Sequence, residues 1–231
     1  MDSSAAADED PLLLLASASS GRRTTLERAG IAHTARAVDL DEEAVLASRP
    51  ELPPGEQVLL LAREKALAGV AESDGGYVVL GCDSMLEIDG AMVGKPHTAE
   101  RARERWRAAR GRTALLHSGH WIVDDRDEVD GGTGATLGAT ATAQVTFADL
   151  DDEEIEAYIA SGEPLEVAGA FTIDGRGGPF ITRVDGDPHA VVGLSLPLLR
   201  DLLREIDLPI HLLWTPSACI DSGPSGTTLD P

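Results

Sequence analysis

The sequence predicts a mixed α/β fold in which two lobes surround a twisted sheet and leave a groove between them. Helix and strand patterns alternate along the first half of the chain, and two long strand patterns in the middle suit an antiparallel pair. The length of 231 residues is ample for a sizeable core without disulfides. We expect a single domain over residues 12–213, between a disordered acidic leader at 1–11 and a flexible tail at 214–231.

The first half of the chain supplies two strand–helix units. Residues 12–16 predict an apolar strand, which a polar turn at 17–21 joins to a helix at 22–29. A second strand is expected at 35–40. Residues 57–71 carry apolar side chains at helical spacing on one face, which predicts the second helix.

The middle of the chain begins with a buried strand at 77–81, which runs directly into Cys82-Asp83-Ser84. Asp89-Gly90 then separates two short strand patterns at 85–88 and 91–93, and this dipeptide is typical of a hairpin turn. The remaining expected elements are helices at 98–110, 151–161 and 196–206, strands at 113–124, 139–147 and 180–184, and a mobile glycine- and threonine-rich loop at 131–138.

Composition excludes several classes of function. The formal net charge of −21 repels nucleic acid phosphates, so polynucleotide binding is not expected. No apolar stretch approaches the length of a membrane span, and the first ten residues are acidic where a secretion signal would be basic. The only cysteines, Cys82 and Cys219, cannot form a disulfide scaffold, which indicates a reducing, cytoplasmic location.

One candidate binding site lies between the first strand and the first helix. Free backbone N–H groups at a helix N-terminus favour an anion, and Ser17, Ser19 and Arg22 add hydroxyl and guanidinium donors. These residues predict a phosphate site. The alternative is a simple serine N-cap followed by solvated arginines.

Two acidic motifs are candidates for a metal site or a general base. Asp83 follows the end of a buried strand, where open α/β sheets place ligand-handling residues. Glu42, within Asp41-Glu42-Glu43 after the expected second strand, is a further metal carboxylate. The alternatives are a turn-forming aspartate and a solvated acidic run.

Lysine is rare in this chain. Of 19 basic Lys and Arg residues, only Lys65 and Lys95 are lysines, which suggests that these two positions need a compact ammonium group. Gly94-Lys95-Pro96 is not a P-loop, because its spacing is one residue short and proline replaces the magnesium-binding hydroxyl. The alternative for Lys95 is a solvated turn residue. No histidine spacing supports a zinc hydrolase, and no serine lies in a nucleophile elbow.

Taken together, eight short motifs in this order resemble the Maf family of nucleoside triphosphate pyrophosphatases, in its actinobacterial branch. They are Leu15-Ala-Ser-Ala-Ser19 with Arg22, Asp41-Glu42, Lys65-Ala66, Gly81-Cys-Asp-Ser84, Gly94-Lys-Pro96, Gly119-His120, Ala168-Gly-Ala-Phe171 and Val192-Gly-Leu194.

The resemblance implies a deep nucleotide cleft and divalent-metal-dependent cleavage of a nucleoside triphosphate into a monophosphate and pyrophosphate. It also implies Mg²⁺ or Mn²⁺ as cofactor and a possible homodimer. Carried over by position, Asp83 is the acid–base residue, Ser17, Ser19, Arg22 and Ser84 contact substrate, Glu42 and Asp83 hold metal, and Lys65 and Lys95 clamp phosphate.

Departures from the family pattern concern the base and the turnover rate, and Ser84, where pyrimidine-selective members have threonine, is one of them. Gly21 stands where the Ser-Pro-Arg-Arg motif has its first arginine, and Asp174 stands where pyrimidine-selective members have glutamine. We therefore predict that Asp174 lines the base pocket and that dTTP and UTP are not preferred. Ala190 replaces an asparagine near the cleft, which removes a polar anchor.

The sequence leaves two rival functions. One is a non-catalytic nucleotide-binding regulator of septum formation, and the other is a metal-dependent monophosphatase. We expect instead a hydrolase that removes modified or non-standard nucleotides, because Asp83, Glu42, Lys65 and Lys95 are all present.

Overall fold

A computed structural model describes residues 11–215 of the chain, and its centre is one seven-stranded sheet. The strand order is β2-β1-β3-β5-β6-β7, with β4 paired to the far half of β3. β1 is parallel to both β2 and β3, whereas all other pairs are antiparallel. The strands are β1 (Leu13–Ala16), β2 (His33–Arg36), β3 (Val78–Ile88), β4 (Ala91–Val93), β5 (Thr113–Asp124), β6 (Thr136–Phe147) and β7 (Ile181–Asp185).

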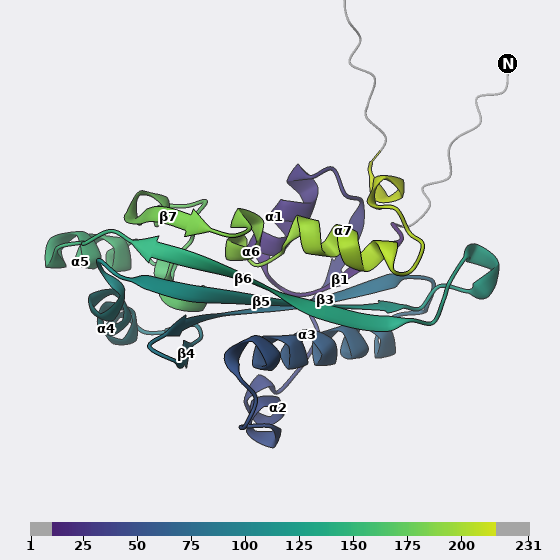
Figure 1. The fold of residues 1–231 in the computed structure, drawn as a ribbon, viewed down its shortest axis with the longest axis horizontal. Helices are drawn as coiled ribbons and strands as arrows, with labels where there is room; N and C mark the ends of the chain where they lie inside the picture. Colours follow the sequence, from purple (N-terminus) through teal and green to yellow (C-terminus); the bar gives the residue numbers. More distant parts are fainter. Residues whose placement is uncertain (1–10, 216–231) are drawn as a thin grey trace, which may run out of the picture.

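Helices cover both faces of the sheet (Figure 1). The long α3 lies along one face, with α2 beneath it, while α1, α6 and α7 cover the other face and α4 and α5 lie at one end. The α-helices are α1 (Ser20–Arg28), α2 (Glu42–Ser48), α3 (Pro54–Ala71), α4 (Ala99–Ala109), α5 (Asp152–Ala160), α6 (Pro188–Val192) and α7 (Leu196–Arg204). This arrangement is the predicted mixed α/β fold.

Two glycines let α3 approach the sheet closely. A Cβ added to Gly81 on β3 would lie 2.0 Å from the Ala62 carbonyl oxygen, and one added to Gly119 on β5 would lie 2.4 Å from that of Val58. Neither distance is possible for a real side chain. The glycines therefore fix the height of α3 above the strands, and with it the position of Lys65, which α3 carries.

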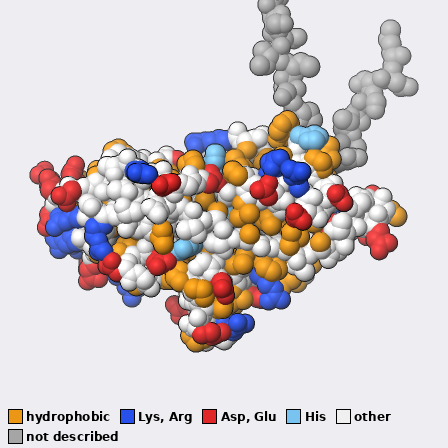
Figure 2. Space-filling view, viewed as in Figure 1, with side chains coloured by type: hydrophobic (Ala, Val, Ile, Leu, Met, Phe, Trp, Pro, Cys, Tyr) orange, Lys and Arg blue, Asp and Glu red, His pale blue; other side chains and the backbone are white. Residues whose placement is uncertain are grey.

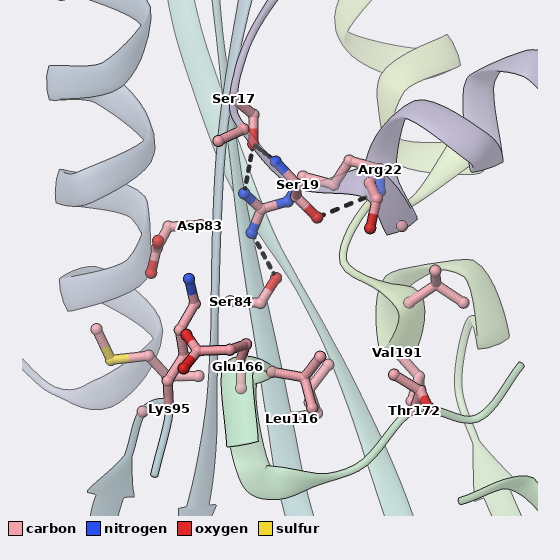
Figure 3. Close-up of a pocket in the computed structure, with 18 of the residues that line it drawn as sticks. Ser17, Ser19, Arg22, Asp83, Ser84, Lys95, Leu116, Glu166, Thr172 and Val191 are labelled. Atoms are coloured by element: carbon pink, nitrogen blue, oxygen red, sulfur yellow. Dashed lines mark hydrogen bonds between the residues drawn. The ribbon is translucent and has the colours of Figure 1, made fainter. Parts of the chain in front are cut away.

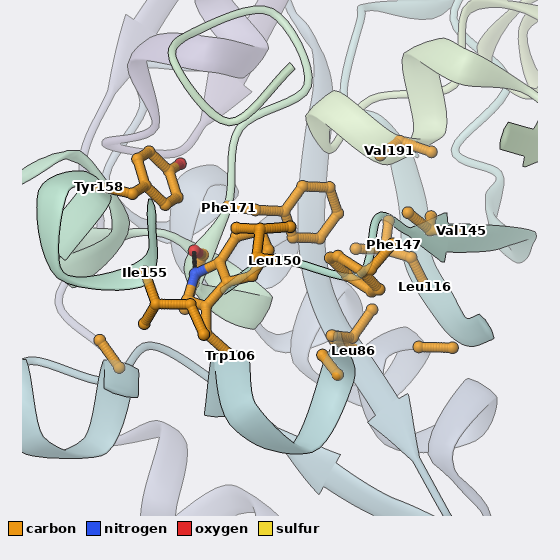
Figure 4. Packing of buried hydrophobic residues seen from close by; sticks show 14 of the residues in the cluster. Leu86, Trp106, Leu116, Val145, Phe147, Leu150, Ile155, Tyr158, Phe171 and Val191 are labelled. Atoms are coloured by element: carbon orange, nitrogen blue, oxygen red, sulfur yellow. Dashed lines mark hydrogen bonds between the residues drawn. The ribbon is translucent and has the colours of Figure 1, made fainter. Parts of the chain in front are cut away.

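Two clusters of buried side chains form the cores of the two lobes. The first joins β1, α1 and α7 through leucines such as Leu13, Leu26 and Leu199. The second surrounds Trp106, whose ring meets Phe147 and Tyr158 edge-on at centroid distances of 5.5 and 5.4 Å (Figure 4). Edge-to-face contacts of this kind add to the burial of the rings.

Charged side chains of both signs gather at the end of the molecule where α4 and α5 lie (Figure 2). The dense arginine face of α4 meets the acidic first turns of α5, since Arg107 and Arg110 both bond Asp152 at 2.8 Å. These arginines thus join two helices. None of the helices within residues 11–215 combines the length and the apolar character that crossing a bilayer requires.

Several boundary predictions were wrong. The second strand covers His33–Arg36 and not 35–40, because its parallel partner β1 offers only four residues for pairing. Residues 77–88 do not form two strands but one, β3, since β5 pairs with it along nearly its whole length. The helices α2 and α6 were not predicted because they have only seven and five residues, although Asp41 and Asp187 cap them.

The loop predicted to be mobile at 131–138 is partly built into the fold. Its last three residues open β6, and Thr133 donates two hydrogen bonds of 2.8 Å to the buried carboxylate of Asp124. The expected leader lies outside the described residues except for Pro11, as does Cys219. Of the predicted tail, Trp214 bridges Ile31, and residues 216–231 lie outside the described range.

Candidate active site

A cleft of about 900 Å³ opens where β1 ends, between the two lobes (Figure 3). Its walls come from the β1–α1 turn, the middle of β3, the segment after β4, residues 166–174 and the end of α6. Every residue predicted to form the site lines this cleft: Ser17, Ser19, Arg22, Glu42, Lys65, Asp83, Ser84, Lys95 and Asp174.

Asp83 lies in the floor of the cleft, in the middle of β3. It does not follow the end of its own strand, as predicted, but lies two residues beyond the point where the neighbouring β1 stops, at the Ala16–Gly81 pair. The end of β1 leaves one side of β3 uncovered there. The strand end that borders the site is therefore the end of β1. Strand β3 continues past that point, where it pairs antiparallel with β5.

The Asp83 carboxylate is one of three charged groups in contact, together with the Lys65 ammonium and the Glu42 carboxylate. The Lys65 ammonium from α3 lies 2.6 Å from Asp83 Oδ1 and 2.7 Å from Glu42 Oε1. The other oxygen, Oδ2, is buried and has no hydrogen-bond partner among the described residues. Burial raises the pKa of Asp83 above that of an ordinary carboxyl, while the Lys65 and Arg22 cations oppose that shift.

Arg22 is a buried cation that is held by neutral groups. Its Nε donates to the Gly193 carbonyl at 3.0 Å, and its two terminal nitrogens donate to Ser17 Oγ and Ser84 Oγ, both at 3.1 Å. No carboxylate within residues 11–215 forms an ion pair with it. A buried guanidinium without a counterion attracts an anion from the cleft.

The serines around Arg22 have structural and binding roles together. Ser19 caps α1 by accepting a hydrogen bond from the Arg22 N–H at 3.4 Å, so the N-cap alternative is part of the structure. The helix begins at Ser20, and Ser19, Ser20 and Gly21 all line the cleft, so the first turn of α1 borders the cavity. Capping and anion binding therefore share this turn.

Lys95 lies on the same side of the cleft as Asp83, and its side chain points toward that carboxylate (Figure 3). It has no hydrogen bond or ion pair with any described residue, in contrast to Lys65. The Gly94–Lys95 turn is held from behind, since the Arg105 guanidinium donates to the Gly94 carbonyl. Lys65 is therefore held by two carboxylates, whereas Lys95 has no partner among the described residues.

Asp174 also lines the cleft, within the segment 172–177. Its carboxylate is 3.9 Å from Arg28 at the end of α1, and both side chains are partly exposed. Gly21 also lines the cleft, and the space beside its Cα borders Val192. The structure therefore brings Asp174 and Gly21 into one cavity, as the base-pocket prediction requires.

Two residues behind the site, Ser118 and His120, were not among the predicted site residues. Ser118 on β5 bonds Ser84 Oγ and the Ala190 carbonyl, both at 2.7 Å. His120 accepts from the Ser195 N–H at 2.8 Å through Nε2, and burial lowers the pKa of this imidazole to about 4. These contacts seat the α6–α7 connection that holds Arg22. Only the Gly119-His120 motif signalled them in the sequence.

A family model described as Maf-like protein matches residues 12–206, almost the whole described chain. The chain belongs to the Maf family. Members similar to it include proteins of Leifsonia xyli subsp. xyli (54% identical over 203 residues, 85% of this chain and 93% of that protein) and Salinispora tropica (48% over 217 residues, 92% and 91%). A third, from Streptomyces coelicolor, is 47% identical over 200 residues, 86% and 92% of the two chains. All three Maf-family relatives are named nucleoside triphosphate pyrophosphatase, and the predicted actinobacterial branch is confirmed.

Proposed function

We propose that this Maf-family protein hydrolyses a nucleoside triphosphate to a nucleoside monophosphate and pyrophosphate. Its relatives carry that activity in their names, and the cleft offers the groups that the reaction needs. The observation that carries the proposal is the Asp83 carboxylate, which has one oxygen fixed by Lys65 and the other buried without a hydrogen-bond partner among the described residues, in a cleft lined by cations and hydroxyls.

The triphosphate occupies the positive side of the cleft. Arg22, Lys95 and the N-terminal turn of α1 present donors to the same space. Arg22 and Lys95 have no carboxylate partner among the described residues, so their charges are available to the polyanionic substrate in a protein of net charge −21. We assign the phosphate chain to these residues.

Asp83 is the general base in this scheme. Water attacks the α-phosphorus, the bond to the β-phosphate bridging oxygen breaks, and pyrophosphate leaves. Asp83 Oδ2 takes the proton from that water, while Lys65 keeps the carboxylate oriented through Oδ1. The raised pKa of Asp83 brings this carboxylate closer to the range in which a base accepts a proton effectively.

The carboxylates also fit a divalent cation. Mg²⁺ is commonly bound by one or two carboxylates together with substrate phosphates and water. Asp83 and Glu42 both contact the Lys65 ammonium, at 2.6 and 2.7 Å, so the two carboxylates lie close together in the cleft. No group of three or more His, Cys, Asp or Glu side chains placed to hold a metal is found within residues 11–215, so we expect substrate phosphates and water to supply the remaining ligands. Mg²⁺ or Mn²⁺ bound there would neutralise charge that develops on the phosphates.

We place the base against the part of the cleft that Asp174 lines. An ionised Asp174 accepts hydrogen bonds and cannot donate them, which favours a base edge with adjacent donors, such as guanine N1–H and its exocyclic amine. Uracil and thymine present the O4 acceptor there. We assign the enzyme to guanine-type and modified triphosphates, and we further propose a cytoplasmic enzyme that forms a homodimer.

A panel of standard and modified nucleoside triphosphates tests the function, with pyrophosphate detection in Mg²⁺, in Mn²⁺ and in EDTA. We expect pyrophosphate in either metal and none in EDTA. Nucleotide binding without turnover in both metals would support a non-catalytic regulator. Release of orthophosphate would support a monophosphatase instead.

A further inference from the structure

The segment 172–177 carries Asp174 and forms one wall of the cleft, yet it contains no helix or strand. Its two ends are fixed by the aromatic core: Phe171 is buried and packs on Phe147, and Phe180 meets the Trp106 and Tyr158 rings. Thr172 lies on the cleft wall itself (Figure 3). What holds the middle of the segment is a single carboxylate behind that wall.

That carboxylate belongs to Glu163, which does not line the cleft. Its Oε1 accepts from the Tyr158 hydroxyl at 2.8 Å, from Thr172 Oγ1 and from the Gly177 N–H at 3.0 Å. Its Oε2 accepts from the Arg176 N–H at 2.9 Å. Four donors thus converge on one side chain, and three of them come from the segment that carries Asp174.

The segment is shaped to enclose this carboxylate. A Cβ added to Gly175 would lie 2.7 Å from Glu163 Oε2 and 2.5 Å from Thr172 Oγ1, and one added to Gly177 would lie 2.6 Å from the Tyr158 hydroxyl. Tyr158 is part of the buried cluster, so the carboxylate is tied to the core (Figure 4). Gly175 has room only because it lacks a side chain.

The donors around Glu163 require an ionised acceptor. Burial raises its pKa, but the hydrogen bonds from Thr172, Arg176, Tyr158 and Gly177 outweigh that effect and lower the pKa below the ordinary value. A neutral amide of the same shape would turn an NH₂ group toward at least one donor, and charge-assisted bonds of this kind are about twice as strong as neutral ones.

We propose that Glu163 is a positioning residue for base selection: it holds the 172–177 segment so that Asp174 faces the nucleobase. This inference rests on the proposed function and on the base-reading role of Asp174. It places the determinant of substrate choice behind the cleft wall, on a residue that touches neither the base nor the phosphates.

Two variants test this role, and both act on the same contact. Glu163→Gln removes the charge, and Gly175→Ala pushes a methyl group against the carboxylate. Glu153→Gln is the control, because it makes the same charge change on exposed α5 at a residue without a hydrogen bond or ion pair to the described chain. The measurements are kcat/KM for GTP and for UTP, and the inhibition constant of inorganic pyrophosphate, which probes the phosphate end alone.

We expect the GTP-to-UTP ratio of kcat/KM to fall about fivefold or more in each variant, while pyrophosphate inhibition stays within about twofold of wild type. The double variant should lose no more than either single variant, because both break one unit. An unchanged ratio in both variants, or a pyrophosphate constant that rises in parallel with the ratio, would overturn the inference. Should a variant fail to fold, Tyr158→Phe removes one of the four donors from behind the wall and is judged by the same criteria.

The wild-type enzyme separates this inference from the function beneath it. Equal hydrolysis of GTP and UTP would refute base selection by the 172–177 segment and leave the pyrophosphatase intact. Absence of pyrophosphate from every triphosphate would refute both.

Discussion

Lys65 is bonded by two carboxylates at once, and this geometry explains why the chain keeps a lysine there. A compact ammonium fits between Asp83 and Glu42 at 2.6 and 2.7 Å, whereas a planar guanidinium is longer and spreads its donors. Lys95 is free to approach a phosphate as a point charge. We therefore expect that positions 65 and 95 each need the size and shape of a lysine side chain as well as its positive charge.

We predict that Lys65→Arg and Lys95→Arg each lower kcat/KM by about tenfold or more although the charge is kept. Steady-state kinetics with pyrophosphate detection measure the effect. Arg63→Lys is the matched control, since it makes the reverse exchange on the exposed face of α3 beside Trp121. Wild-type kcat/KM in both lysine variants would restore the solvated-turn interpretation of Lys95 and the view that any cation serves at Lys65.

His120 predicts how stability depends on pH. Its folded pKa of about 4 lies below the ordinary value of 6.5, so the unfolded state binds the proton more tightly. The contribution of this imidazole is therefore present above about pH 6.5 and is lost as pH falls toward 4. Denaturant unfolding should show a loss of about 2 kcal/mol from this group between about pH 7 and about pH 5. His120→Gln should lack that part of the loss; an identical pH dependence in the variant would show that His120 is protonated without cost.

At the scale of single elements, we propose that the 172–177 segment sets the choice of base. We predict that Asp174→Gln shifts the ratio of kcat/KM toward UTP and dTTP by about tenfold or more, because an amide both donates and accepts where the carboxylate only accepts. Competition assays with paired triphosphates measure this ratio directly. If the wild-type enzyme already prefers UTP or dTTP, or the ratio does not move, Asp174 does not read the base.

Strand β3 shows why some element predictions were right in type and wrong in extent. The residue pattern broke at Cys82-Asp83-Ser84 because polar side chains interrupted an apolar run, yet β5 continues to pair with them. The polarity marked a change of environment, where β1 ends and the cleft begins, and not a change of backbone. The hairpin at Asp89-Gly90 was predicted well because both residues need positive φ, at 54° and 78°, which is a local property.

At the scale of the whole molecule, the residues that line the cleft could be predicted from the sequence, but the residues that hold them from behind could not. Asp83, Lys65 and Arg22 stand in recognisable motifs, and the structure brings all of them into one cleft. Ser118 and Glu163 carry no motif, because their partners are fixed by register and loop path, such as the Ala190 carbonyl across from β5. Backbone acceptors of this kind leave no trace in the residue types.

Ala190 also contributes to the site through its backbone and not through its side chain. An asparagine there was expected to anchor the cleft through its side chain, but the position is buried and contributes through its carbonyl, which accepts from Ser118. Any residue supplies that carbonyl. The loss of the side chain therefore leaves the Ser84–Ser118 support of Arg22 in place.

The central claim is that Asp83 drives hydrolysis between the α- and β-phosphates in this cleft. Product analysis of one purine triphosphate by wild type and Asp83→Asn, side by side, tests it most directly. We predict equal amounts of monophosphate and pyrophosphate from wild type, and a turnover at least about a hundredfold lower in the variant with an unchanged circular dichroism spectrum. Orthophosphate as the first product, or an Asp83→Asn variant that releases pyrophosphate at the wild-type rate, would contradict it.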